Sequence, residues 1–513
     1  MNRLILRAKR KRNWYNKKGK ITQQSDSDAS LSSDDEEEVS KDIVGHWFDG
    51  RYIAIKYLGR GTYSRVWLIY NVEEKEYYAM KMIMAEYFDE AIHELNIYNK
   101  LGKLNEDSRL VKIKEHFCFN DNNKVVCIIL EFMGICIIDL FKKYSNENIP
   151  ITLIKKVFTD ILLGLEELDS KKIIHTDLKA ENVMLNIYTY KITKLKTWFS
   201  SLEIPKLYYD SITIELPMDY SSYSSDRRKK VKRKTRIRVQ KKITIYIKQK
   251  IEIYNELLKK ERKEQCNEIK EIDDIDDLDE FELHDYDKND NFDYNEHELE
   301  KYTAKIIDFG NAELQEKCEQ EEIQLRAYRP PENIIDLCYD TKADIWSFGC
   351  ILYETLTDEY LFNINGKDSL EKDRDHLHQM YELFGKMPRT MAENCEFSEE
   401  LFDAKGRILK HRTCDYKDFH LYLKERIVNK FLCEDEIKNL SDLLLSIFKY
   451  NPKERFSARD CLEHKWFKWF KWFERVECFK EFNCKETNSE LNSNENVIDI
   501  SSSNQNTCEG ISN

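Results

Sequence analysis

The chain has 513 residues, of which 41% are hydrophobic, so it can bury a sizeable core, and this length predicts two or three domains. Its formal net charge of −13 argues against bulk binding of nucleic acid and suits a surface that attracts a basic substrate. The longest apolar run is interrupted by Glu131 and is too short to cross a bilayer, and the fourteen cysteines show no metal-ligand spacing, which predicts a soluble intracellular protein.

The first patterned region begins after a polar N-terminal extension. Residues 1–45 are basic and then rich in serine and acidic residues, which leaves little to bury and predicts disorder. Alternating β-branched and aromatic residues in "RYIAIKYLGRGTYSRVWLIYNVEEKEYYAMKMI" predict short antiparallel strands, and a helix in "YFDEAIHELNIYNKL" interrupts the strands. With the long amphipathic helix of "IPITLIKKVFTDILLGLEELDSKK", residues 46–186 are predicted to form the first part of a folded domain.

Residues 187–300 differ in kind from the sequence on either side. The basic run "RRKKVKRKTRIRVQKK" is followed by a mixed-charge helical stretch and then by the acidic run "DDIDDLDEFELHDYDKNDNFDYNEHELE". A basic block before an acidic block predicts a largely disordered insert that folds back on itself electrostatically.

Regular patterning returns in residues 301–475, where several amphipathic helices are predicted. Residues 476–513 are rich in Asn, Ser and Glu and are expected to be a disordered tail. Together these patterns predict an α+β fold, in which a small β-rich lobe precedes a larger helical lobe that the long charged insert divides in sequence.

The string "GRGTYSRV" lies between two predicted strands and has the character of a phosphate-binding loop. Gly59 and Gly61 let the backbone approach a phosphate closely and offer N–H groups to its oxygens. Ser64 replaces the usual third glycine, so the motif alone does not exclude an ordinary hairpin. About fifteen residues later, Lys81 lies on a predicted strand from which its ammonium group can reach phosphates. Glu94, on the following helix, is the expected ion-pair partner of Lys81, and Glu90 is the second candidate.

The string "IIHTDLKAENVML" is the more specific signal. Asp177 is placed to accept the proton of a substrate hydroxyl, and Lys179 can stabilise the phosphoryl group in transfer. Asn182 can hold a metal ion, and Asp308 in "IIDFGNA" is the expected second ligand, since Mg²⁺ prefers carboxylate and amide oxygens together with phosphate. In this order, the motifs predict an enzyme that transfers a phosphoryl group with the help of Mg²⁺.

These motifs resemble those of the eukaryotic protein kinases over roughly 47–187 and 300–470. Within that superfamily, "HTDLKAEN", "DFGNA", the glycine loop and the long charged insert are similar to the SR-protein kinases, which phosphorylate serines in arginine–serine repeats of splicing factors. LAMMER kinases share the His-Thr-Asp variant, but the motif that names them is absent at "DHLHQMYELFG" and they lack so long a spacer. The resemblance implies a bilobal kinase fold, and an ion pair between Glu332 and Arg455 that braces the larger lobe.

The resemblance also implies which residues bind ATP. They lie in the glycine loop, on the strand that carries Lys81, and in the hinge "LEFMG", whose backbone groups would bind adenine. The predicted contacts are Gly59, Arg60, Gly61, Thr62, Tyr63, Ser64, Val66, Ala79, Lys81, Glu131 and Met133.

Substrate-docking residues are implied in the same way. Basic positions beside the residue after the phosphorylated serine would favour an acidic or phosphorylated neighbour, and an acidic groove would bind arginine-rich segments. The basic positions are Arg326, Arg329 and Lys372, and the acidic positions are Glu359, Asp368, Asp375 and Glu382. For Arg329, an intramolecular brace is an equally good interpretation.

Thr176 occupies the position beside the catalytic Asp where many kinases carry an arginine that an activation-loop phosphate must neutralise. Without that arginine, no phosphate is required, and the segment between Gly310 and Tyr328 contains no Ser, Thr or Tyr. These features predict a kinase that is active as made. Ala180 replaces a family Pro, and Leu325 stands where Ser/Thr kinases usually have a Thr that bridges the catalytic Asp and Lys.

The sequence therefore predicts a monomeric serine/threonine kinase of arginine/serine-rich proteins, located in cytoplasm and nucleus. A LAMMER-type dual-specificity kinase and a pseudokinase scaffold are the alternatives, although the presence of Lys81, Asp177, Asn182 and Asp308 argues against the scaffold. The basic run 227–242 is interpreted as a contact for an import factor or chaperone rather than for nucleic acid, because an acidic block follows it in the insert.

Overall fold

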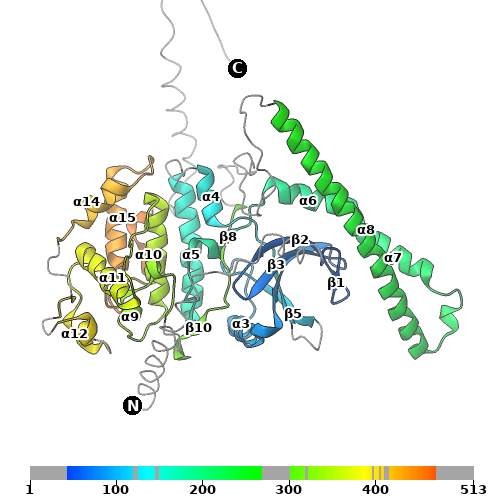
Figure 1. The fold of residues 1–513 in the computed structure, drawn as a ribbon, viewed down its shortest axis with the longest axis horizontal. Helices are drawn as coiled ribbons and strands as arrows, with labels where there is room; N and C mark the ends of the chain where they lie inside the picture. Colours follow the sequence, from blue (N-terminus) through cyan, green and yellow to red (C-terminus); the bar gives the residue numbers. More distant parts are fainter. Residues whose placement is uncertain are drawn as a thin grey trace, which may run out of the picture.

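The computed structural model describes residues 43–119, 125–144, 149–268, 301–317, 322–395, 398–403, 406–409 and 415–468. They form a small lobe of strands and a larger lobe of helices (Figure 1), as the sequence predicts. The predicted tail 476–513, the acidic run 273–300 and nearly all of the extension 1–45 lie outside the described residues. In the part of the chain that the structure describes, no helix is both long enough and apolar enough to span a membrane.

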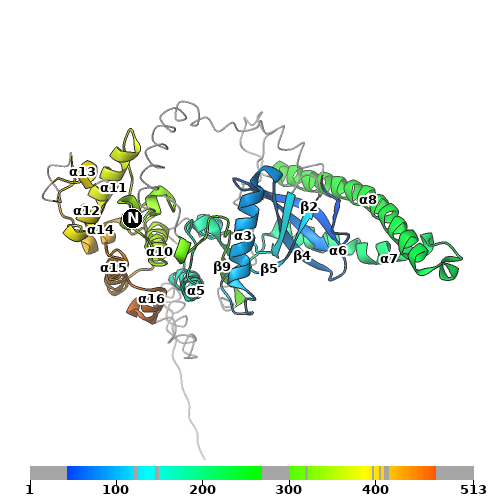
Figure 2. The ribbon, with the colours of Figure 1, turned by 90° about the horizontal axis from the view of Figure 1, so that it is seen from below.

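The small lobe is built on one six-stranded antiparallel sheet with the strand order β1-β2-β3-β4-β6-β5. The alternating β-branched and aromatic residues form these strands because a pleated sheet directs successive side chains to opposite faces. The bounds are β1 Trp47–Phe48, β2 Tyr52–Arg60, β3 Ser64–Asn71, β4 Glu76–Ile83, β5 Ile113–Phe119 and β6 Val125–Glu131. The predicted helix between β4 and β5 is α3, Phe88–Leu101, which runs beside the sheet (Figure 2).

The larger lobe is helical around α5 and α10. Its helices are α4 Ile137–Tyr144, α5 Ile151–Ser170, α9 Pro331–Ile334, α10 Lys342–Thr357, α11 Ser369–Phe384, α12 Arg389–Asn394, α13 Ser398–Leu401, α14 Phe419–Arg426, α15 Glu434–Ile447 and α16 Ala458–Glu463. The larger lobe also contains two small antiparallel sheets: β7 Ile173–Ile174 pairs with β10 Glu313–Leu314, and β8 Val183–Leu185 pairs with β9 Ala304–Ile306.

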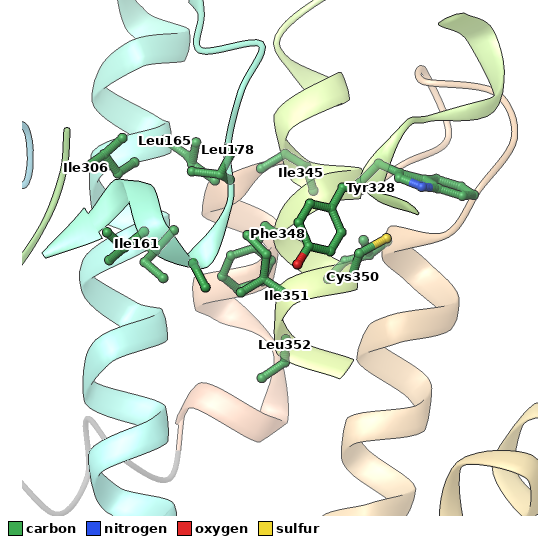
Figure 3. Close-up of a cluster of buried hydrophobic side chains, with 14 of the residues drawn as sticks. Ile161, Leu165, Leu178, Ile306, Tyr328, Ile345, Phe348, Cys350, Ile351 and Leu352 are labelled. Carbon is green, nitrogen blue, oxygen red and sulfur yellow. The ribbon is translucent and has the colours of Figure 1, made fainter. Parts of the chain in front are cut away.

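The core of the larger lobe holds the loop "HTDLKAEN", residues 175–182, in place. Ile161 and Leu165 of α5 meet Phe348 and Ile351 of α10, and Leu178 of the loop enters the same cluster (Figure 3). Leu178 has no exposed surface, so the loop is anchored by burial between its two charged residues.

The insert is helical where the structure describes it, so the prediction of a largely disordered insert is wrong for this part of the chain. The elements are α6 Tyr190–Ser201, α7 Ile204–Glu215, the short 3₁₀ turn Tyr220–Ser222 and α8 Ser225–Glu268. Thr189 caps α6 by accepting a hydrogen bond from the Ile192 N–H at 3.2 Å. In α8, a buried position recurs every fourth residue through the charged run, at Thr235, Val239, Ile243 and Ile247. This narrow apolar stripe folds the insert, although charge dominates its composition.

The insert helices pack against the small lobe, and α8 extends beyond that lobe (Figures 1 and 2). The shared apolar cluster joins Leu68 and Tyr70 of β3 to Phe199 of α6 and Val239 of α8. Residues two apart on a strand share a face, so Leu68 and Tyr70 lie on the same face of β3 as Val66, one of the predicted ATP contacts. The insert therefore packs on the same face of the sheet as the candidate nucleotide site, farther along β3.

Candidate active site

Lys81 lies in the middle of the small lobe's sheet, where β4 pairs it with Val66 of β3 and Ile128 of β6. Its Nζ is 2.8 Å from a carboxylate oxygen of Glu94 on α3 and 2.7 Å from Oδ1 of Asp308. The predicted Lys81–Glu94 pair is thus confirmed, and Glu90 is exposed. One ammonium joins the sheet, α3 and the segment that follows β9.

The charges of this triad are mutually dependent. Burial opposes the charge on Lys81, but the carboxylates of Glu94 and Asp308 outweigh it and raise the pKa of Lys81 above its usual value. Burial raises the pKa of Glu94, while for Asp308 the nearby Lys81 ammonium overcomes burial and lowers the pKa. Lys81 therefore stays a cation, the form that attracts phosphate oxygens.

The predicted catalytic residues of the loop lie within hydrogen-bond distance of one another. Lys179 Nζ donates to Oδ2 of Asp177 at 3.0 Å, and the Asn182 amide donates to the Asp177 carbonyl oxygen at 2.8 Å. His175 holds the base of the loop, since its Nε2 donates to the Ile307 carbonyl at 2.9 Å. His175 thus has a structural role, and the acidic and basic groups of the loop converge.

Asn182 and Asp308 are distant in sequence, but pairing of β8 with β9 brings them together. The Ile307 N–H donates to the Asn182 carbonyl at 2.9 Å, directly before Asp308. Asp308 adopts a left-handed backbone conformation (φ 64°) that turns the chain at this point. Asn182 donates hydrogen bonds through its amide nitrogen. Its amide oxygen and a carboxylate oxygen of Asp308 are therefore the groups that would bind a metal ion. This set of hard oxygen donors fits a divalent cation shared with phosphate.

The glycine loop joins β2 to β3 beside Lys81. Gly61 N–H donates to the Ser64 carbonyl at 2.8 Å, and a Cβ at Gly61 would lie only 3.0 Å from Ser64 Oγ. Ser64 is 6% exposed, so its hydroxyl occupies the space beside Gly61. Tyr63 packs against Tyr87 with ring centroids 4.8 Å apart. The contacts of this loop with ATP stay a prediction.

The hinge follows β6, and its backbone path requires a glycine. A Cβ at Gly134 would lie 1.7 Å from the Ile187 carbonyl oxygen, at the start of the insert. Glu131 binds Lys305 of β9 at 2.7 Å, and Met133 is buried. Lys305 was not predicted from the sequence, although a lysine within an apolar strand is the type of signal that could have indicated it.

Thr176 is held in a left-handed conformation (φ 64°) by contacts with two distant segments. Its hydroxyl donates to the Asn311 carbonyl at 2.6 Å, and its N–H donates to Asp344 of α10 at 3.1 Å. Asp344 also accepts from the His175 N–H at 2.6 Å. Thr176 therefore connects the catalytic loop to the segment after Asp308.

Gln324 completes this connection from the activation segment, and its role was not predicted from the sequence. Its side chain accepts from the Leu178 N–H at 2.8 Å and donates to Asp344 at 2.8 Å. Its own N–H donates to the Thr176 carbonyl at 2.7 Å. Leu325, by contrast, is 47% exposed. Gln324 thus supplies the brace beside the catalytic residues. It directly precedes Leu325, the position where Ser/Thr kinases usually have a Thr.

The two arginines of the predicted docking site differ. Arg329 is 7% exposed, and its Nε donates to the Ile323 carbonyl at 3.0 Å, which supports the alternative interpretation of an intramolecular brace. Arg326 pairs with Asp373 of α11 at 2.5 Å and keeps part of its side chain exposed.

The remaining docking residues lie on or near α11. Lys372 is exposed, and Asp375 and Glu382 are on the same helix, as predicted. Each acid also has a neighbour: Asp368 caps α11, Asp375 accepts from the Asn365 N–H at 2.8 Å, Glu382 lies 2.6 Å from Lys417, and Glu359 lies 3.9 Å from Arg426. Docking of a basic substrate here stays a prediction.

The structural ion pair of the larger lobe is confirmed. Both guanidinium nitrogens of Arg455 lie 2.8 Å from the carboxylate of Glu332, and the two side chains are 0% and 1% exposed. A bidentate pair without access to water fixes the end of the activation segment.

Comparison with known proteins agrees with this geometry. The family model for the protein kinase domain matches residues 52–197 and 287–467, on both sides of most of the insert. The chain is 28% identical over 437 residues to the serine/threonine-protein kinase SRPK of Physarum polycephalum, covering 82% of this chain and 87% of that protein. It is 26% identical over 525 residues to SRSF protein kinase 3 of Mus musculus (85% and 91%), and 25% identical over 440 residues to protein kinase dsk1 of Schizosaccharomyces pombe (81% and 80%). The predicted fold and the predicted resemblance are confirmed.

Proposed function

The chain belongs to the protein kinase family, and from that premise we propose that this serine/threonine kinase transfers the γ-phosphate of ATP to serines in arginine- and serine-rich proteins. The observation that carries the proposal is the convergence of two groups of residues. Lys81 lies between Glu94 and Asp308, while Asp177 lies between Lys179 and Asn182.

Each side chain has a role in the transfer. The Asp177 carboxylate accepts the proton as the substrate hydroxyl oxygen forms its bond to the γ-phosphorus. The bond from that phosphorus to the bridging oxygen breaks, and ADP leaves with the electron pair. Lys179 and Lys81 offset negative charge on the transferred group and on the remaining phosphates. Asp308 and Asn182 would hold the divalent cation, which we propose is Mg²⁺ and which supplies further neutralisation of phosphate charge.

Preference for arginine-rich substrates has two supports. Relatives over most of the chain are named SRPK and SRSF protein kinases. The net charge of −13 favours approach of a basic substrate, and Arg326 and Lys372 offer cationic groups for an acidic or phosphorylated neighbour of the target serine.

Activity without activation-segment phosphorylation is supported by the polar network around Thr176. Bonds from Thr176, Gln324 and Asp344 already join the catalytic loop to the activation segment. In kinases that need phosphorylation, a new arginine–phosphate pair orders the same region. Location in cytoplasm and nucleus, a monomeric state and an import factor or chaperone as partner are parts of the same proposal.

The test measures phosphate incorporation from Mg²⁺-ATP into an Arg–Ser repeat peptide, with mapping of the modified residues. We expect phosphoserine flanked by arginine, and loss of nearly all incorporation in Asp177→Asn. Transfer to Ser before Pro would reassign the substrate class, and transfer to Tyr as well as Ser would favour the LAMMER type. No transfer by the unsubstituted protein would favour a scaffold.

A further inference from the structure

Lys196, on the insert helix α6, has its ammonium group among three aromatic rings. Its Nζ lies 4.2 Å from the ring centroid of Tyr188, 5.1 Å from that of Tyr77 and 5.7 Å from that of Phe132. Within the described ranges, Lys196 forms no ion pair with a carboxylate. Aromatic faces attract a cation through their quadrupoles, so this aromatic cage stabilises the charge, together with the Glu76 carboxylate beyond ion-pair distance.

The cage joins three parts of the molecule. Tyr77 belongs to β4, two residues before Ala79, and its hydroxyl donates to the Lys196 carbonyl at 2.8 Å. Phe132 belongs to the hinge, and its ring stacks on that of Tyr188 with centroids 5.2 Å apart and planes at 2°. The insert therefore grips both a strand and the hinge of the small lobe.

The hydroxyl of Tyr188 makes the most informative contact, because it donates to the Phe132 carbonyl oxygen at 3.1 Å. That carbonyl and the Met133 N–H belong to one planar peptide unit. A bond that fixes the carbonyl therefore fixes the direction of the Met133 N–H, the group expected to bind adenine.

We propose that Tyr188 and Lys196 are positioning residues for ATP, which hold the Phe132–Met133 peptide of the hinge in the orientation that binds adenine. The inference rests on the proposed function, since it concerns the nucleotide of that reaction. Burial lowers the pKa of Lys196, which agrees with an ammonium group held by rings rather than by water.

Docking of the insert does not rest on this cage alone. The apolar cluster that includes Leu68, Phe199 and Val239 extends from the cage, whose Tyr77 and Phe132 pack against it, along the rest of the interface. A variant of the cage can thus change the hinge while the insert stays packed, which separates a positioning role from a purely structural one.

The experiment uses the full chain and two substitutions that keep the shape of the cage. Tyr188→Phe removes the hydroxyl and keeps the ring, and Lys196→Met keeps most of the stem and removes the charge. We expect each to raise KM for ATP by about three- to tenfold, the effect of losing one hydrogen bond or one cation–aromatic contact, with kcat and KM for the peptide nearly unchanged. The matched control is Lys194→Met, because Lys194 lies 5.8 Å from the ring of the exposed Tyr190 on the same helix.

Binding of a fluorescent ATP analogue, measured directly, gives the same readout without any phosphate transfer. Weaker binding in Tyr188→Phe and Lys196→Met, with recovery in Lys196→Arg, would support the inference even if no peptide were phosphorylated. Unchanged nucleotide affinity in both variants would overturn it. Equal loss of kcat, both KM values and thermal stability would also overturn it, since that pattern indicates a structural role alone.

Discussion

Two regions of the molecule support the active site, and they do so by different interactions. The catalytic loop is joined to the activation segment by buried hydrogen bonds from Thr176, Gln324 and Asp344. The insert is joined to the small lobe mainly by apolar side chains, such as Phe199 and Val239. Hydrogen bonds are directional and costly to leave unpaired, whereas apolar contact depends on area and tolerates changes of shape. The first region should therefore respond to the loss of single atoms, and the apolar part of the second mainly to buried charge.

The largest effect is expected at Asp344. Asp344→Ala leaves the His175 N–H, the Thr176 N–H and the Gln324 amide without their buried acceptor. Each such group costs about 1–3 kcal/mol, so the free energy of unfolding should fall by about 3 kcal/mol or more. Urea denaturation measures it. Asp344→Asn keeps one acceptor oxygen and should lower the free energy of unfolding by less. A decrease of less than about 1 kcal/mol in Asp344→Ala would contradict the view that buried hydrogen bonds hold the catalytic loop.

A second substitution tests the insert interface. Val239→Asp places a carboxylate in the apolar cluster between α8 and the sheet, where Val239 has no exposed surface. The free energy of unfolding should fall by about 2–3 kcal/mol, or α8 should become open to proteolysis. Ile237→Asp is the control, because Ile237 is 45% exposed and its change should stay within about 0.5 kcal/mol. Equal effects at the two positions would mean that the apolar stripe does not dock the insert.

The smallest effect, and the sharpest, concerns two neighbouring residues of the activation segment. Gln324→Leu keeps the size of the side chain but removes the bond to the Leu178 N–H, so kcat should fall by about tenfold. Leu325→Thr restores the hydroxyl that Ser/Thr kinases usually have and should change kcat by about threefold or less, since Leu325 is largely exposed. Steady-state kinetics on one peptide measures both. A larger change in kcat at Leu325 than at Gln324 would show that Gln324 is not the residue that braces the catalytic loop.

The contrast also explains what could be read from the sequence. Lys81, Asp177, Asn182 and Asp308 lie in short motifs whose spacing and flanking strands predict their chemistry, and the structure brings these residues together. The ion pair of Glu332 with Arg455 was implied by the resemblance to protein kinases, and the structure contains it.

The remaining features depend on packing between distant segments. The apolar stripe of α8 is narrow and lies among lysines and arginines, so composition indicated disorder where the helix in fact docks on the sheet. Gln324 acts through a side-chain amide whose direction is set by a left-handed backbone (φ 63°), and Lys196 acts through rings from three segments. Local sequence patterns do not encode such directions.

We propose that the site is active as made, because its catalytic loop is braced without phosphate. The most direct measurement is the initial rate of phosphate transfer to an Arg–Ser repeat peptide before and after phosphatase treatment, with mass spectrometry to verify that residues 310–328 carry no phosphate. The rate should stay the same within about twofold after treatment, since no activation-segment phosphate contributes to the network. A fall to the level of Asp177→Asn, reversed when the protein is phosphorylated again, would contradict the claim.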